Sequence, residues 1–182
     1  MSESKVNLMN FSRQKLRGYL KSIDEKPFHA DQIIKWIHQK GVTDFTEMSD
    51  LSKSLRQKLN ESAEVTVPKV VLTKPSNDGT HKWLIEMTGG NCIETVFIPE
   101  EGRGTLCISS QVGCILNCSF CSTGKQGFNR NLSVSEIISQ LWVAVRALES
   151  EEVECKRKVT NVVMMGMGEP LLNFENLIDS LE

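Results

Sequence analysis

The sequence lacks a long apolar run, an apolar leader and any sizeable net charge. No stretch of about 18 apolar residues occurs, which excludes a membrane-spanning helix, and we expect no membrane partner. The first residues, MSESKVNLMNFSRQ, lack the apolar segment of a secretory signal peptide, so we expect a cytoplasmic location. A formal charge of −2 gives no support, at the level of composition, for nucleic-acid binding.

Cysteine, in contrast, is concentrated in one place. Six cysteines in a cytoplasmic chain predict metal binding, catalysis or free thiols rather than disulfides. Three of them, Cys114, Cys118 and Cys121, lie within eight residues in QVGCILNCSFCSTG. A structural zinc site takes four protein ligands, yet the nearest histidine, His81, lies 33 residues before Cys114. Cys107 is the only local fourth candidate.

A [4Fe–4S] cluster fits three thiolates better, because its fourth iron keeps an open position for a non-protein ligand. An open iron that binds an amine and a carboxylate is the hallmark of S-adenosylmethionine radical chemistry. The spacing therefore predicts a [4Fe–4S] cluster held by these cysteines, with S-adenosylmethionine as the second cofactor. Three incidental loop cysteines, or a zinc site, are the alternatives.

The pattern of apolar residues changes near residue 65. Residues 1–65 predict a small helical accessory domain, with helices after Ser12, over 33–37 before a capping Gly41, and over 51–59. We expect the third helix to be entered at Ser49 or Asp50. Residues 66–100 contain β-rich runs separated by PSNDG and TGGN, which predict a β linker region with a small antiparallel sheet.

Residues 101–182 alternate between strand and helix patterns. A buried strand, GTLCISS, enters the cysteine loop, and Ser133 with Glu136 predicts a capping box for a long amphipathic helix. A second apolar strand, VTNVVMMG, leads through a glycine loop to another helix. The predicted fold class is α/β, with the first βα units of a barrel after the helical domain. Two βα units cannot close a barrel, so we expect a fragment of a longer protein.

Two loop segments suggest contacts with the cofactor. Phe120 precedes the third cysteine of the triplet and can lie beside an adenine, although loop packing alone would also explain it. In MMGMGEP, Gly166 and Gly168 allow a close backbone approach, and Glu169 can accept a hydrogen bond from an ammonium group. A glycine loop after a parallel strand lies where α/β folds bind ligands.

With the cysteine triplet, GKQGFNRNL and GMGEP in this order, the chain resembles the RlmN family of radical S-adenosylmethionine RNA methyltransferases. The segments KPFHADQIIKWIHQKGVTDFTEMSDLSKSLRQKL and IETVFIPE resemble the family's accessory domain, which is expected to bind RNA, and its linker strand. The resemblance implies methylation of carbon 2 of adenine in 23S rRNA and of the adenine next to the anticodon in tRNA. It also implies an external one-electron reductant.

The resemblance implies specific roles for residues of this chain. The three cysteines of the triplet would hold the cluster, and Gly168 and Glu169 would contact the cofactor. The family methylates one protein cysteine and resolves the product with a second cysteine through a disulfide. Cys107 matches the resolving cysteine, and Glu94 matches the residue that handles a proton on adenine. Without the resemblance, Glu94 is a solvent-facing strand carboxylate and Cys107 a buried strand thiol.

Other charged residues and cysteines receive weaker interpretations. Lys125 and Arg130, beside the cysteine loop, can meet RNA phosphates, whereas the run 156–158 is expected to be a solvated loop. Neither Cys92 nor Cys155 matches the family's methyl-carrying cysteine, which lies near the end of a longer chain. We therefore expect these 182 residues to be unable to methylate RNA alone. The alternatives are a Cfr-type enzyme acting at carbon 8, or a non-catalytic zinc- or RNA-binding module.

Overall fold

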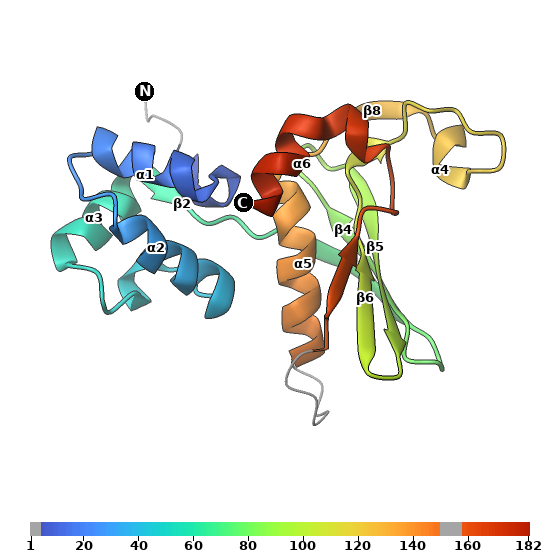
Figure 1. Ribbon diagram of the computed structural model, residues 1–182, viewed down its shortest axis with the longest axis horizontal. Helices are drawn as coiled ribbons and strands as arrows, with labels where there is room; N and C mark the ends of the chain where they lie inside the picture. The colour runs from blue at the N-terminus through green and yellow to red at the C-terminus, as the bar shows by residue number, and fades with distance from the viewer. Residues whose placement is uncertain (1–4, 150–157) are drawn as a thin grey trace. The chain divides into compact units, whose positions relative to one another are not determined.

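The computed structural model describes residues 5–149 and 158–182 (Figure 1). The chain divides into two compact units, one ending at Thr66 and the other running from Val67 to Leu181. Cys155 and the charged residues 156 and 157 lie outside the described residues. The predicted boundary near residue 100 is not tested by this division and stays a prediction.

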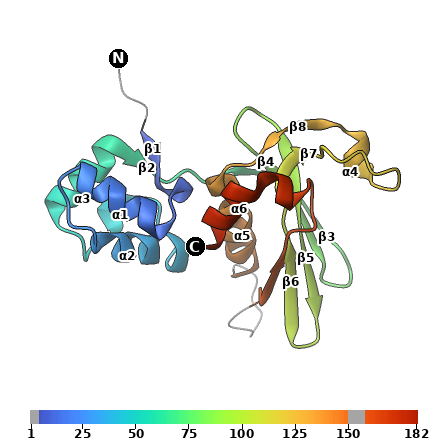
Figure 2. The same cartoon turned by 45° about the horizontal axis from the view of Figure 1, so that its top comes forward.

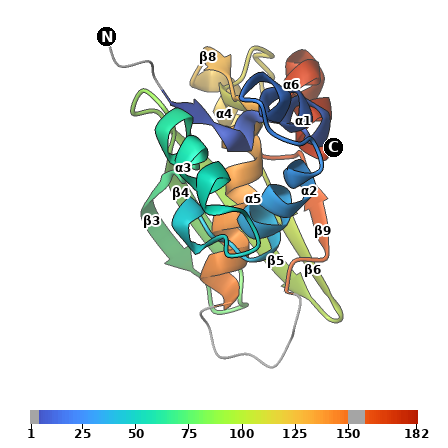
Figure 3. The ribbon, with the colours of Figure 1, turned by 90° about the vertical axis from the view of Figure 1, so that its left-hand side faces the viewer.

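The first unit is a helical domain closed by a short strand pair. Its helices are α1 (Arg13–Ser22), α2 (His29–Ile34) and α3 (Lys53–Ser62), which Figure 3 shows with their shorter connections. α2 continues into a π-helical turn, η2 (Lys35–Gln39), and η1 (Leu8–Asn10) and η3 (Phe45–Glu47) are 3₁₀ turns. β1 (Val6–Asn7) pairs in parallel with β2 (Ala63–Glu64), so the two ends of the unit meet. The apolar faces form its core, with Leu16, Leu20, Ile33, Ile37, Leu55 and Leu59 almost fully buried.

The helix caps of this unit explain where its helices begin. The Ser12 hydroxyl accepts a hydrogen bond from the Lys15 backbone N–H, which confirms the predicted cap of α1. The predicted start of α3 is wrong. Ser52 is its cap, with the hydroxyl accepting from the Leu55 N–H at 3.1 Å. The Asp50 carboxylate lies two residues before this cap and accepts from the Trp36 indole N–H.

The second unit is built on one mixed sheet of five strands in the order β3-β4-β5-β6-β9 (Figure 2). The strands are β3 (Lys69–Pro75), β4 (His81–Glu86), β5 (Cys92–Glu100), β6 (Arg103–Cys107) and β9 (Asn161–Val163). β3 to β6 are antiparallel neighbours, and β9 is parallel to β6. β3, β4 and β5, the strands of the expected linker region, therefore belong to the same sheet as β6 and β9. The tight turn after Glu100 connects β5 to β6, which pair in antiparallel fashion.

Helix α5 (Val134–Glu149) connects β6 to β9 and covers one face of the sheet (Figure 1). Its capping box is reciprocal, since Glu136 N–H donates to the Ser133 hydroxyl and Ser133 N–H donates to the Glu136 carboxylate. α6 (Phe174–Leu181) follows β9. The order β6, α5, β9, α6 confirms the α/β fold class and the predicted parallel strand pair.

The side chains of each strand alternate between the covered face and the opposite face. The covered face carries Trp83, Ile85, Ile93, Phe97 and Leu106, which form one core with Ile137, Val143, Ala144 and Leu148 of α5. The opposite face carries Glu94 and Ile98, both exposed, and Cys107, which is half-buried. None of the helices in residues 5–149 and 158–182 has the length and apolar character needed to cross a bilayer.

Candidate active site

The cysteine loop is closed at its base by a short antiparallel ladder. β7 (Gln111–Gly113) pairs with β8 (Phe128–Asn131), and the Cys114 N–H donates to the Gly127 carbonyl at 3.1 Å. Gly113 has a φ of +72°, and a Cβ there would lie 1.8 Å from the Gly127 oxygen. Only glycine fits at this position, so the sequence of the loop base fixes where the three cysteines emerge.

The three thiols of the loop are free and partly exposed. Cys121 is the N-cap of the short helix α4 (Ser122–Lys125). The backbone N–H of Gly124, and then that of Thr123, lower the pKa of the Cys121 thiol. Among the described residues, no three His, Cys, Asp or Glu side chains converge closely enough to hold a metal ion. The chemistry of the donor set, three free thiols with one shifted toward thiolate, fits an iron–sulfur cluster.

The GMGEP loop lies directly against the entry to the cysteine loop. The Met167 carbonyl accepts from the Ser110 N–H at 2.8 Å and from the Gln111 N–H at 3.1 Å. Gln111 also accepts from the Glu169 N–H through its side chain at 3.0 Å. The two motifs, about 50 residues apart in sequence, therefore meet after the parallel strands β6 and β9.

Gly168 is required by this loop-to-loop packing. Its φ is +97°, and a Cβ would lie 2.4 Å from the Gln111 Cβ. Contact with Gln111 alone therefore explains why this position is glycine, and no ligand is needed to account for it. Contact between Gly168 and the cofactor stays a prediction. The Glu169 carboxylate caps η4 (Pro170–Asn173) by accepting from the Leu171 N–H at 3.1 Å, and the side chain is only partly buried.

A buried polar junction around Ser109 joins these loops to the sheet. The Ser109 hydroxyl donates to the Glu94 carbonyl at 2.7 Å and accepts from the Met167 N–H at 2.9 Å. The Gln140 side chain accepts from the Ser109 N–H at 2.7 Å and donates to the Ser109 carbonyl at 2.9 Å. It also accepts from the Thr95 hydroxyl at 2.9 Å. One glutamine of α5 thus fixes the end of β6 against β5.

Sequence reasoning missed this junction. Gln140 is completely buried within the apolar stripe of α5, three residues after Ile137 and four before Ala144. A polar residue at a core-facing position of an amphipathic helix was the available signal, because such a residue must find buried partners.

Glu94 and Cys107 lie on the same face of the sheet, opposite α5. Cys107 is the cross-strand partner of Val96, so Glu94 is its diagonal neighbour on β5. Burial raises the pKa of the Cys107 thiol, and a hydrogen bond from the Met165 N–H offsets part of this effect. The Glu94 carboxylate forms an ion pair with Lys82 at 3.2 Å, with both side chains about half exposed. Lys82 is a further residue that sequence reasoning missed.

The contacts of Arg130 lie within the second unit, and its predicted role at RNA phosphates stays a prediction. Nη1 and Nη2 of its guanidinium each donate a hydrogen bond to the Glu136 carboxylate, at 2.7 and 2.8 Å. Nη2 also donates to the Thr88 carbonyl at 2.6 Å. Burial alone would raise the pKa of the Glu136 carboxyl, but the Arg130 and Ser133 hydrogen bonds hold it below its usual value. Arg130 therefore fastens β8 to the start of α5.

Phe120 and Lys125 both face solvent in the loop. The Phe120 side chain is 92% exposed, so packing within the loop does not account for it. Lys125 is exposed at the end of α4. Cys92, which has no role in the motifs, is partly buried at the start of β5.

Comparison with known proteins connects this geometry to one family. Residues 6–65 match the family model described as the ribosomal RNA large subunit methyltransferase N-terminal domain. Across all 182 residues the chain is 62% identical to the dual-specificity RNA methyltransferase RlmN of Francisella tularensis subsp. novicida strain U112. It is 60% identical to the protein of the same name from subsp. holarctica strain LVS. The resemblance to the RlmN family is confirmed.

The relatives are considerably longer than this chain. The chain spans 49% of the length of these RlmN relatives. A solved structure, titled as a radical SAM methyltransferase from Sphaerobacter thermophilus, has a TM-score of 0.84 at 35% identity. The match covers 97% of this chain and 51% of that one. The similarity to the RlmN proteins therefore covers a helical unit, the mixed sheet and both loops.

Proposed function

We propose that this chain is the N-terminal part of a radical S-adenosylmethionine methyltransferase that modifies carbon 2 of adenine in 23S rRNA and in tRNA, in the cytoplasm. The observation that carries the proposal is the contact between the cysteine loop and the GMGEP loop at the ends of β6 and β9. In α/β folds this edge of the sheet binds ligands. The relatives named RlmN supply the RNA substrate class.

The residues of the two loops have distinct proposed roles. Cys114, Cys118 and Cys121 would hold a [4Fe–4S] cluster that, when bound, supplies the electron that cleaves S-adenosylmethionine. The Glu169 carboxylate keeps one oxygen free of a described hydrogen bond, which suits an ammonium group. The exposed Phe120 ring can lie against the cofactor's adenine.

Glu94 and Cys107 are proposed to act on the substrate side. The Glu94 carboxylate lies beside Lys82 on the strand face opposite α5, where it can take a proton from adenine. Burial raises the pKa of the Cys107 thiol, so it would act as a nucleophile only after losing its proton. Its thiolate would then attack the methyl-bearing sulfur of a second cysteine, forming the sulfur–sulfur bond while the sulfur–carbon bond breaks and its electron pair leaves with the carbon attached to adenine. The disulfide formed in that step needs a second cysteine from the remainder of a longer protein. An external one-electron reductant completes the proposed set of partners.

The decisive experiment is anaerobic reconstitution of the 182-residue chain with iron and sulfide. We expect about four irons per chain, a brown chromophore, and an electron-paramagnetic-resonance signal that changes when S-adenosylmethionine is added. Cys118→Ala should abolish the chromophore, whereas Cys92→Ala should keep it. A single colourless zinc would overturn the proposal in favour of a zinc-binding module.

A second measurement tests whether these 182 residues can methylate RNA without the rest of a longer protein. Incubation of the reconstituted chain with cofactor, reductant and unmodified RNA should yield no methylated adenine. A longer protein that contains the methyl-carrying cysteine should yield methyl at carbon 2, located on the base by mass spectrometry. Methyl at carbon 8 would instead identify a Cfr-type activity.

A further inference from the structure

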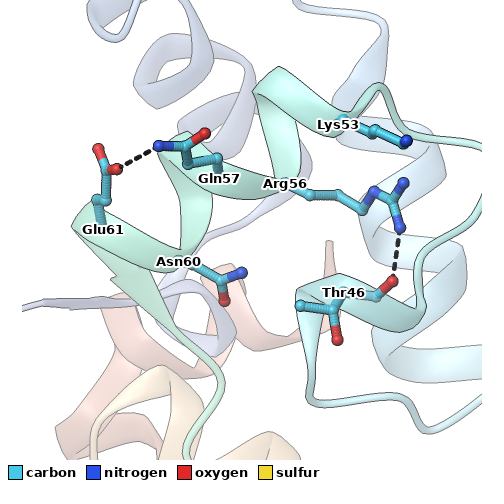
Figure 4. A pocket seen from close by; sticks show the side chains of 6 residues that line it. All are labelled: Thr46, Lys53, Arg56, Gln57, Asn60 and Glu61. Atoms are coloured by element: carbon cyan, nitrogen blue, oxygen red, sulfur yellow. Dashed lines mark hydrogen bonds between the residues drawn. The ribbon is translucent and has the colours of Figure 1, made fainter.

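The polar face of α3 forms a pocket beside the turn η3, within the first unit (Figure 4). The pocket has a volume of about 470 Å³. Five of its lining residues follow one face of α3, and the sixth belongs to η3: Lys53, Arg56, Gln57, Asn60, Glu61 and Thr46. Leu55 and Leu59 face the core on the other side of the helix. The six lining residues all belong to the first unit, whereas both loops of the candidate active site belong to the second.

The two cationic side chains of the pocket lie on the same side of α3. Lys53 and Arg56 are one helical turn apart and extend in the same direction in Figure 4. The Arg56 guanidinium is fixed by a 2.6 Å hydrogen bond from Nη1 to the Thr46 carbonyl. Its Nε is buried and has no hydrogen-bond partner in the part of the chain that the structure describes. A buried donor without a partner indicates a missing acceptor.

Two acidic side chains, Glu61 of the pocket and Asp44 beside Thr46, accept hydrogen bonds from neutral donors. Glu61 accepts from the Gln57 side chain at 3.0 Å and points away from Arg56 in Figure 4. The Asp44 carboxylate accepts from both the N–H and the hydroxyl of Thr46, at 2.8 and 2.7 Å. These bonds hold the carboxylates on neutral donors, and they leave Lys53 and Arg56 available to an anion.

We propose that this pocket binds a phosphate of an RNA backbone, an inference that rests on the proposed RNA substrate. Two cations supply charge, and the Asn60 amide supplies a neutral donor that matches phosphate or ribose oxygens. A solvated helix face would also be polar, but it would not leave the buried Arg56 Nε without an acceptor among the described residues. The pocket therefore positions RNA, while chemistry occurs in the second unit.

The test is fluorescence anisotropy of the 182-residue chain with a labelled RNA stem-loop, measured over a range of KCl concentrations. Lys53→Gln and Arg56→Gln should each weaken binding severalfold. Each should also reduce the slope of log affinity against log salt by about 0.7 to 1. The matched control is Lys35→Gln, which removes an exposed cation of the same unit outside the pocket. It should leave the slope nearly unchanged.

Several outcomes would overturn the proposal. Equal losses for Lys35→Gln and Arg56→Gln would show unspecific attraction. Wild-type binding of inorganic phosphate in an NMR titration, without tighter binding of the RNA, would assign the pocket to a free anion. Arg56→Lys checks the geometry, because it keeps the charge and should still lose affinity when the fork-shaped donor is required. Circular dichroism of each variant confirms that the unit is folded.

The failure of this inference is distinguishable from failure of the proposed function. The pocket variants lie outside the loops, so they should reconstitute with the same iron content and chromophore as the unmodified chain. If no cluster forms in any of them, the radical chemistry is wrong while the RNA titration still decides the pocket. If the cluster forms and the pocket variants bind RNA normally, only the pocket is wrong.

Discussion

The two faces of the five-stranded sheet are made by alternate residues of the same strands, yet they differ in character. On β5, Ile93, Thr95 and Phe97 are buried under α5, while Glu94 and Ile98 are exposed on the opposite face. The covered face holds the fold together and the opposite face carries the proposed chemistry. Substitutions one residue apart should therefore have very different effects on stability.

The largest effect is expected at Gln140, the polar side chain buried on the covered face. Gln140→Leu keeps a similar volume but leaves the Ser109 N–H, the Ser109 carbonyl and the Thr95 hydroxyl without their partner. Because buried groups without hydrogen bonds are costly, the free energy of unfolding should fall by about 3–5 kcal/mol. Urea unfolding followed by tryptophan fluorescence measures this loss.

The matched control is Gln126→Leu, which changes an exposed glutamine of the same unit. Its unfolding free energy should stay within about 0.5 kcal/mol of the original. A loss below about 1 kcal/mol for Gln140→Leu would show that the junction around Ser109 does not hold the sheet and the loops together.

The next effect concerns Glu136, whose carboxylate joins the cysteine-loop ladder to α5. Glu136→Gln breaks a mostly buried pair with Arg130, and should cost about 2–4 kcal/mol at pH 7. The folded-state pKa of Glu136 is lowered, so the stability it contributes is present above its unfolded pKa, near 4.3. That contribution is lost as the pH falls through the folded pKa.

The pH series makes this prediction specific. The difference in unfolding free energy between the original protein and Glu136→Gln should shrink as the pH falls below about 4.3. Ser133→Ala is a useful control, because it removes the helix-capping hydroxyl and keeps the ion pair. Its smaller cost should be the same at both ends of the pH range. A pH-independent cost for Glu136→Gln would contradict the role of its charge.

Local sequence patterns were enough to predict most helices and strands, but not the side-chain contacts between elements that are distant in sequence. The capping box at Ser133 and Glu136 and the cap at Ser12 were readable because both involve residues three positions apart. The start of α3 was misread because Ser49, Asp50 and Ser52 are all good caps. The sequence alone does not show which of them the helix uses, nor that Asp50 bonds to Trp36.

The candidate site was predicted only as a set of motifs. Spacing suggested a cluster from Cys114, Cys118 and Cys121, and glycine suggested a close approach at Gly168. The residue approached, Gln111, could not be known, because contacts between loops about 50 residues apart depend on strand order. The role suggested for Arg130 stays a prediction, but its ion pair was not foreseen, for a related reason. A charged residue beside a loop has no visible partner until Glu136 is placed in space.

The third prediction compares two thiols, one from each region of the site. The pKa of Cys121 is lowered by the backbone N–H groups of Gly124 and Thr123, and that of Cys107 is raised by burial. In the cluster-free chain, iodoacetamide should therefore label Cys121 severalfold faster than Cys107 at pH 7, because the thiolate is the nucleophile. Mass spectrometry of time points measures both rates in one sample.

A pH series again supplies the control. The rate at Cys107 should continue to rise at pH values where the rate at Cys121 has levelled off, since its thiol loses its proton later. Urea should remove the difference, because both shifts come from the folded structure. Faster labelling of Cys107 at pH 7 would contradict the burial of its thiol beside Met165.

The smallest effect is expected on the face opposite α5, at Glu94. Its ion pair with Lys82 is about half exposed on both sides, so Glu94→Gln should change the unfolding free energy by less than about 0.5 kcal/mol. Thr95→Val, one residue along, removes the hydroxyl that donates to Gln140 and should cost about 1–2 kcal/mol. Equal costs would mean that the two faces are not divided as described. Because Glu94→Gln should spare the fold, a loss of RNA methylation in a longer protein carrying it would report on proton transfer and not on stability.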